Sequence, residues 1–187
     1  MGPVVWFTGL PASGKSTLAR LIAQRLREAG RPCCLLDSDD VRRVLVPPPD
    51  YSVAGRDHFY ATLAGMTALL AEQDLVVLVA ATAHRRAYRD AARERVGRFI
   101  EVHVATPLEE CRERDPKGLY RNARGAAATT LPGLGARYEA PVAPEVVADG
   151  GRDEYAIAEI LARLASGPRA AAQSGGRRRH RTGSDAH

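Results

Sequence analysis

A glycine-rich segment near the N-terminus has the residue types and spacing of a phosphate-binding loop. Two glycines separated by four residues precede a lysine and two hydroxyl side chains, in the order Gly9, Leu10, Pro11, Ala12, Ser13, Gly14, Lys15, Ser16 and Thr17. Such glycines allow backbone N–H groups to surround phosphate oxygens at the start of a helix. Lys15 would contact the β and γ phosphates, and the Ser16 hydroxyl would bind Mg²⁺. The alternative, a chance glycine-rich turn, does not account for the apolar strand before it and the amphipathic helix after it. The segment predicts a site for ATP and Mg²⁺.

Two carboxylates follow the second apolar segment. Asp37 and Asp39 lie two residues apart, and the carboxyl ends of strands in an open α/β sheet face the ligand crevice. One would point toward Mg²⁺ and the other toward an acceptor hydroxyl, and Asp39 is our candidate for catalysis and metal binding. The alternative is that these acids cap a short helix at 41–46, a role we expect for Asp40.

Basic residues gather in a second region, at 112–124. Of 27 basic residues only two are lysines, Lys15 and Lys117, and the second lies in this glycine-punctuated run. A solvated surface is the default interpretation of single arginines such as Arg42 and Arg56. The run, however, suits a mobile lid, at about 112–137, that closes over phosphates and excludes water. Arg114 is our candidate for a contact to the ATP phosphates.

Short apolar segments alternate with amphipathic helical patterns along the chain. This alternation predicts an α/β fold in which helices cover both faces of a parallel sheet. The strands are expected at 3–8, 33–37, 75–81, 99–105 and 145–148, and long irregular connections at 47–56 and 115–142.

Composition separates the chain into a body at 1–166 and a basic tail at 167–187. The tail has five arginines and one acid, so it accounts for most of the net charge of +5, and its lack of an apolar pattern predicts disorder. Without interleaved aromatic residues the tail is not expected to bind nucleic acid.

The longest apolar stretch is too short to span a membrane. Three cysteines with no disulfide spacing predict reduced thiols and a cytoplasmic protein.

Longer motifs resemble the adenylylsulfate kinase family. They are GLPASGKSTLA at 9–19, LLDSDDVRRVL at 35–45, Tyr51-Ser52 with Arg56, PLEECRERDPKGLY at 107–120 and YEAPVAPE at 138–145. The resemblance covers about residues 3–165. It implies a P-loop three-layer sandwich with a five-stranded parallel sheet. It also implies transfer of phosphate from ATP to the 3′-hydroxyl of adenylyl sulfate (APS), giving PAPS and ADP in sulfate assimilation.

The resemblance also assigns roles to individual positions. Asp39 matches the acid near Mg²⁺ and the acceptor hydroxyl, Arg42 and Arg56 match anion contacts of the substrate, and Lys117 matches the lid lysine. Tyr51 matches a phenylalanine that stacks on the substrate adenine. The full set of expected substrate contacts is Asp37, Arg42, Tyr51, Arg56, Phe59, Thr82, Ala83, Lys117 and Leu131. We expect a homodimer.

Three of these positions depart from the family pattern. Ala83 replaces a serine, Phe59 an asparagine and Leu131 a second adenine-stacking phenylalanine. A phosphoserine route is impossible at Ala83, which leaves direct in-line transfer. The departures keep two alternatives open: a kinase for another small hydroxylated acceptor, and a non-catalytic nucleotide- or nucleic-acid-associated protein that uses the basic tail.

Overall fold

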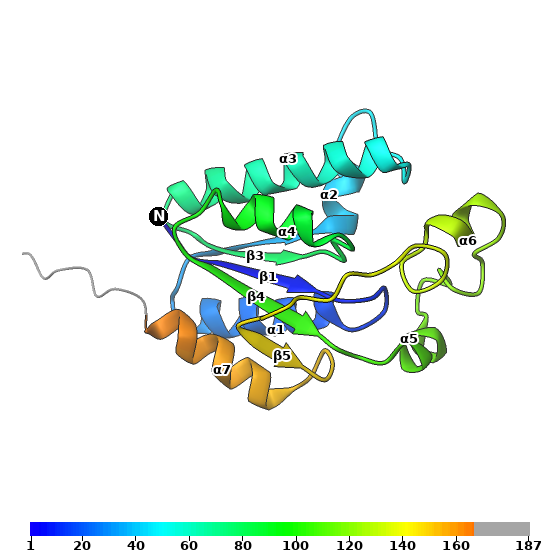
Figure 1. Ribbon diagram of the computed structural model, residues 1–187. Helices are drawn as coiled ribbons and strands as arrows, with labels where there is room; N and C mark the ends of the chain where they lie inside the picture. The colour runs from blue at the N-terminus through cyan, green and yellow to red at the C-terminus, as the bar shows by residue number, and fades with distance from the viewer. Residues whose placement is uncertain (167–187) are drawn as a thin grey trace, which may run out of the picture.

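Five parallel strands form the centre of the protein, for which a computed structural model describes residues 1–166 apart from the side chains of Ala126 and Ala127. Neighbouring strands pair in the order β2-β3-β1-β4-β5, so their carboxyl ends share one edge (Figure 1). The strands are β1 Val4–Thr8, β2 Cys33–Asp37, β3 Val76–Ala80, β4 Phe99–Val104 and β5 Val146–Ala148.

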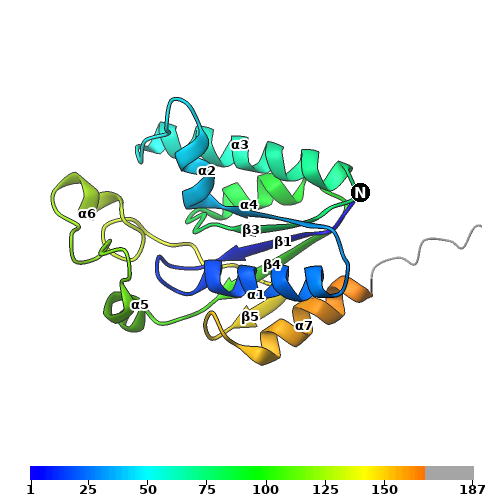
Figure 2. The ribbon, with the colours of Figure 1, turned by 180° about the vertical axis from the view of Figure 1, so that it is seen from behind.

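Helices cover both faces of the sheet, as Figures 1 and 2 show from opposite sides. On one face lie α1 (Lys15–Glu28) and α7 (Glu154–Ala165), and on the other lie α2 (Ser38–Val44), α3 (Val53–Glu72) and α4 (Arg86–Arg93). The alternating side chains of β1 explain the two layers: Val5 and Phe7 join the core of the first face, and Val4 and Trp6 that of the second. The expected three-layer α/β sandwich is confirmed.

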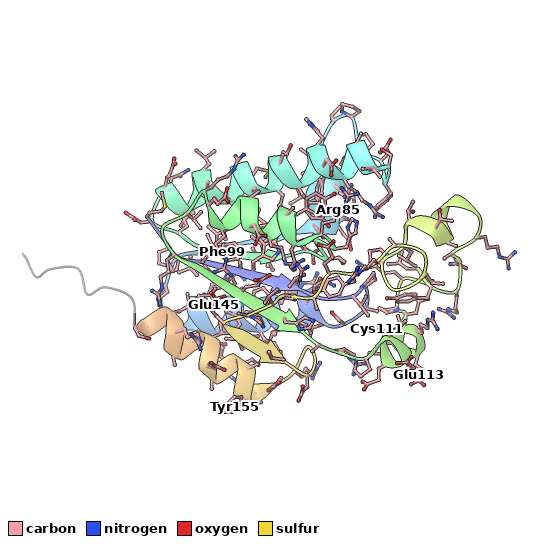
Figure 3. The ribbon with its side chains drawn as sticks, viewed as in Figure 1. Arg85, Phe99, Cys111, Glu113, Glu145 and Tyr155 are labelled. Carbon is pink, nitrogen blue, oxygen red and sulfur yellow. The ribbon has the colours of Figure 1, made fainter. Side chains whose placement is uncertain are left out.

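Two more helices stand outside these layers and carry the segment expected to be a lid. They are α5 (Leu108–Arg114) and α6 (Ala126–Thr130), and α6 projects away from the sheet beyond the carboxyl ends of the strands (Figure 1). On α5, Cys111 is buried and Glu113 is exposed (Figure 3). The segment therefore starts from an anchored helix.

The structure corrects two local predictions and leaves a third outside its range. The helix expected at 41–46 begins at Ser38, because Asp37 and not Asp40 caps it: the Asp37 carboxylate accepts a hydrogen bond from the Asp39 N–H. The connection at 115–142, expected to be irregular, contains α6. The predicted tail at 167–187 lies outside the described residues.

All three cysteines are free. Within residues 1–166, none of the helices combines the length and the apolar character that a membrane crossing requires.

Candidate active site

A cavity of about 2020 Å³ opens at the carboxyl edge of the sheet. A single small-molecule site occupies roughly 300–1,000 Å³, so this cavity has room for two ligands. Five chain segments supply most of its wall: the glycine-rich loop, the start of α2, the connection before α3, the lid segment and the connection between β5 and α7.

The glycine-rich loop forms one end of the cavity. Gly9 and Gly14 have φ values of 155° and 106°, which L side chains rarely adopt, and Ala12 also has a positive φ of 63°. A Cβ on Gly14 would lie 2.5 Å from the Gly151 nitrogen, so no side chain fits there. Because α1 begins at Lys15, its unpaired N–H groups face this end of the cavity.

Lys15 is a buried cation that forms no ion pair with another residue in the described part of the chain. It is 9% exposed, and its ammonium donates a hydrogen bond to the Leu10 carbonyl at 2.7 Å. Within residues 1–166 it forms no salt bridge, and burial lowers its pKa to about 8. A buried ammonium that faces free helix N–H groups fits a bound polyphosphate, which would supply the missing negative charge.

Oxygen donors suitable for Mg²⁺ lie beside this lysine. Ser16, Asp37 and Asp39 line the same cavity. The described residues contain no cluster of three or more acids, histidines or cysteines able to hold a metal alone. This arrangement fits Mg²⁺, which proteins usually bind through one or two side chains together with substrate phosphates.

Asp37 and Asp39, at the end of β2, have different roles. Asp37 is buried, caps α2 and pairs with Arg20 at 3.4 Å. It therefore fixes the turn that presents Asp39. Asp39 itself is half-exposed and forms an ion pair with Lys117 of the lid segment.

The lid segment contacts the glycine-rich loop as well as Asp39. The carboxylate of Asp115 accepts hydrogen bonds from the N–H groups of Tyr120 and Arg121, at 3.1 and 3.0 Å, which closes the turn that carries Lys117. The Tyr120 hydroxyl donates to the Pro11 carbonyl at 3.2 Å. Arg114 and Leu131, the other expected ligand contacts on this segment, also line the cavity.

Two arginines and a tyrosine form the opposite end. The guanidinium of Arg42 lies between two rings, 4.6 Å from the centroid of Tyr51 and 3.7 Å from that of Phe59. Arg56 is buried and donates to the Thr130 carbonyl at 2.6 Å. Arg42, Tyr51 and Arg56 all line the cavity, and together they offer positive charge beside an exposed aromatic face.

The loop after β3 completes this end. Thr82 and His84 line the cavity. Burial, together with the nearby charges of Arg56 and Arg85, lowers the pKa of His84 to about 4, so its ring is uncharged at neutral pH. The positive charge at this end therefore comes from the arginines.

The structure does not place every expected ligand contact on the cavity wall. Phe59 and Ala83, expected to touch the substrate, are fully buried and do not line it. Phe59, on α3, belongs to the core between that helix and the sheet, and its ring packs against the guanidinium of Arg42. In the glycine-rich loop, Gly9, Leu10 and Ser13 likewise lie behind the wall, while the remaining residues of the motif line it.

Sequence reasoning missed several residues of the site. The connection Asp149, Gly150, Gly151, Arg152 and Asp153 lines the cavity, and Gly151 packs against Gly14 and Thr17. Two adjacent glycines, one residue after an apolar strand, were the available signal. Tyr60 and Arg20 also line the cavity, but their positions in helices gave no comparable signal.

One cavity thus joins a polyphosphate-binding loop to a second anion site, with a carboxylate and a lysine between them. Transfer of a phosphoryl group between two bound molecules requires this arrangement, and the fold and the site define the protein as a P-loop kinase. The family model for adenylylsulphate kinase matches residues 1–149. The chain belongs to the adenylylsulphate kinase family, as its motifs indicated.

Individual relatives agree with this assignment. An adenylyl-sulfate kinase of Citrobacter koseri is 42% identical over 165 residues, which cover 87% of this chain and 81% of the relative. The structure of a Mycobacterium tuberculosis APS kinase in complex with AMPPNP and APS is similar with a TM-score of 0.80 and 36% identity, covering 88% of this chain and 98% of that one. A hexameric APS kinase from Thiobacillus denitrificans has a TM-score of 0.64 and 32% identity, over 88% of this chain and 29% of that chain.

Proposed function

We propose that this protein transfers the γ-phosphate of ATP to the 3′-hydroxyl of adenylyl sulfate, giving PAPS and ADP. The observation that carries the proposal is the single cavity with the glycine-rich loop at one end and Arg42, Tyr51 and Arg56 at the other. The Mycobacterium tuberculosis relative, at 36% identity, has been seen with AMPPNP and APS together.

The residues near the glycine-rich loop would hold ATP. Lys15 and the N–H groups at the start of α1 contact the β and γ phosphates, and Arg114 and Lys117 add charge from the lid segment. Ser16 and Asp39 would hold Mg²⁺, which when bound neutralises charge on the triphosphate.

Asp39 would orient the acceptor hydroxyl and take its proton during transfer. It pairs with Lys117, but both side chains are more than half exposed. Such an exposed pair contributes about 0–1 kcal/mol. Lys117 can therefore exchange Asp39 for a phosphate at little cost when ATP binds. Ala83 has no hydroxyl, so the phosphoryl group passes directly to the acceptor.

The opposite end would hold adenylyl sulfate. The exposed face of Tyr51 suits stacking on adenine, and Arg42 and Arg56 suit the phosphosulfate. Arg42 is held by two rings and Arg56 by a backbone carbonyl, so both guanidiniums are positioned before a ligand arrives.

A second candidate function is phosphorylation of a different hydroxylated acceptor, which is favoured by Leu131 on the cavity wall, where the family pattern has an adenine-stacking phenylalanine. A coupled assay that follows ADP release separates the two. ATP turnover that depends on APS supports the first candidate. Turnover only with other acceptors supports the second, and a lack of turnover with every acceptor refutes both.

We further propose that the protein is a cytoplasmic homodimer. The three free thiols agree with a reducing compartment. Light scattering on the purified full chain tests the dimer, and a monomeric mass would refute it.

A further inference from the structure

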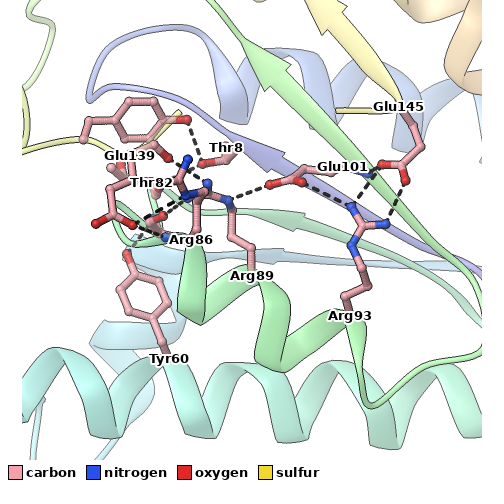
Figure 4. A network of polar contacts seen from close by, with 11 residues as sticks. Thr8, Tyr60, Thr82, Arg86, Arg89, Arg93, Glu101, Glu139 and Glu145 are labelled. Carbon is pink, nitrogen blue, oxygen red and sulfur yellow. Dashed lines mark hydrogen bonds and ion pairs between the residues drawn. The ribbon is translucent and has the colours of Figure 1, made fainter. Parts of the chain in front are cut away.

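A buried arginine on α4, outside the cavity, connects four parts of the fold. Arg89 is 1% exposed. It donates one hydrogen bond from Nε to Glu101 Oε1 at 2.6 Å, a second from Nη1 to the Ala83 carbonyl, and a third from Nη2 to the Glu139 carbonyl at 2.7 Å. Figure 4 shows the hydrogen bonds around its guanidinium.

The loop after β3 depends on such contacts for its shape. Ala83 has a φ of 39°, a left-handed conformation that is uncommon for a residue with a Cβ. Residues held in such regions persist when surrounding contacts determine them, and they cluster at functional sites. Thr82 and His84, on either side of Ala83, line the end of the cavity assigned to the acceptor.

The recorded hydrogen bonds of this loop come from different parts of the fold. Thr8 of β1 donates its hydroxyl to the Thr82 carbonyl at 2.7 Å. The Ala83 N–H donates to the Tyr60 hydroxyl of α3 at 2.9 Å, and the His84 carbonyl accepts from the Glu139 N–H at 2.8 Å. Arg89 holds both the Ala83 carbonyl and the Glu139 carbonyl, so it joins the loop to the segment that supports it.

The carboxylate that balances the charge of Arg89 is that of Glu101, which does not line the cavity. Glu101 on β4 is buried and accepts from Arg89 and also from Arg93, whose Nη2 lies 3.2 Å from Glu101 Oε2. Arg93 pairs in turn with Glu145 at 2.7 Å and contacts no part of the loop after β3 (Figure 4). The two arginines thus share one carboxylate, but only Arg89 reaches the acceptor side.

We propose that Arg89 is a positioning residue for the acceptor half of the active site: it holds the strained Thr82–Ala83–His84 backbone in the shape that the second substrate contacts. The proposal rests on the proposed function for the identity of that substrate. None of the recorded hydrogen bonds of Arg89 reaches the glycine-rich loop, so we expect its removal to affect binding of the acceptor more than binding of ATP.

The test compares Arg89→Met with Arg93→Met, since each removes one guanidinium from Glu101. In Arg89→Met we expect the KM for APS to rise about ten- to a hundredfold, because small displacements of a positioned site cost about that much. The KM for ATP is expected to stay within about twofold of the unmodified protein in both variants. Arg93→Met is expected to keep the KM for APS as well. Equal effects of the two variants on the KM for APS, or an unchanged KM in Arg89→Met, would overturn the proposal.

A conservative variant covers the possibility that Arg89→Met does not fold. Arg89→Lys keeps a positive charge beside Glu101, but one ammonium cannot reproduce the planar fork that reaches two carbonyls and a carboxylate. We expect it to fold and to raise the KM for APS. A normal KM for APS, or failure of this variant to fold, would show that Arg89 has a purely structural role.

Hydrogen exchange provides a readout that needs no acceptor. The Ala83 amide is buried against the Tyr60 hydroxyl, and we expect it to exchange faster in Arg89→Met than in Arg93→Met. If the unmodified protein shows no turnover with APS, the proposed function fails, and this comparison still decides the role of Arg89. Equal exchange rates would then overturn it.

Discussion

Replacement of Lys15 by methionine is expected to stabilise the nucleotide-free protein while it removes activity. Methionine keeps the unbranched stem of lysine but brings no charge into the buried position. In the absence of ATP, the Lys15 ammonium is buried without a carboxylate partner among the described residues. Removal of that charge is therefore expected to raise the free energy of unfolding of the nucleotide-free protein, although it removes the group that binds phosphate.

The pKa of Lys15 gives the size of this cost. Burial lowers it from 10.5 to about 8. A difference of one in pKa is about 1.4 kcal/mol, so charged Lys15 destabilises the fold by about 3 kcal/mol. Lys15→Met also loses the charge-assisted hydrogen bond to the Leu10 carbonyl, worth about 2 kcal/mol. The expected net gain is about 1 kcal/mol, or roughly 2–4 °C in Tm for a chain of this size.

The pH dependence follows from the sign of the pKa change. The folded-state pKa of Lys15 lies below its unfolded value, so between about pH 8 and 10.5 the unfolded chain binds more protons. The stability of the unmodified protein therefore rises with pH in that window. The advantage of Lys15→Met is full below pH 8 and fades above it.

Urea unfolding of the nucleotide-free proteins at pH 7 and pH 9.5 measures this advantage. Lys117→Met is the matched control, because Lys117 is more than half exposed and its removal is not expected to stabilise the fold. The ADP-release assay should show a loss of about a hundred- to a thousandfold in kcat for Lys15→Met. Lower stability of Lys15→Met at pH 7, or an advantage that does not shrink at pH 9.5, would refute the reasoning.

Three further predictions concern the two ends of the cavity and the metal. Tyr51→Ala should raise the KM for APS by about ten- to a hundredfold, since base stacking is worth about 1–3 kcal/mol, and should leave the KM for ATP unchanged. Tyr51→Phe should match the unmodified protein; equal effects on both KM values would contradict a stacking role. Asp39→Asn should lower kcat by about 10²–10⁴-fold, and a normal kcat would exclude Asp39 as the base. Chelation of divalent cations with EDTA should abolish turnover and added Mg²⁺ should restore it, whereas turnover that survives chelation would contradict a Mg²⁺ site at Ser16 and Asp39.

The fold and the nucleotide end of the site could be predicted because their signals are local. The strands are short and mostly apolar, and the two central ones, β1 and β3, are buried throughout, which needs only neighbours of the same kind. The glycine-rich loop is equally local, because the positive φ at Gly9 and Gly14, the free helix N–H groups and Lys15 all lie within seven residues. These properties depend on the order of residues and not on distant partners.

Contacts between distant segments were decided only by the tertiary structure. Phe59 and Tyr51 are both aromatic and both flank Arg56 in the sequence, yet Tyr51 is exposed at the cavity and Phe59 is in the core. Phe59 lies on α3 and turns inward because of how that helix packs against the sheet, whereas Tyr51 lies in the connection before α3. The sequence pattern does not specify this packing. Asp37 rather than Asp40 caps α2 for a similar reason, since the strand ends where its pairing with β3 ends.

The sequence by itself therefore determined that the chain folds around a parallel sheet and binds a nucleoside triphosphate in a P-loop. Only the tertiary structure brought Lys117 to Asp39, 78 residues away, packed Gly151 against Gly14, and aimed Arg89 at the loop after β3. Pairings of this kind carry no periodicity and no fixed spacing. They arise because the carboxyl ends of all five strands meet at one edge, where residues remote in the chain come within reach of a hydrogen bond.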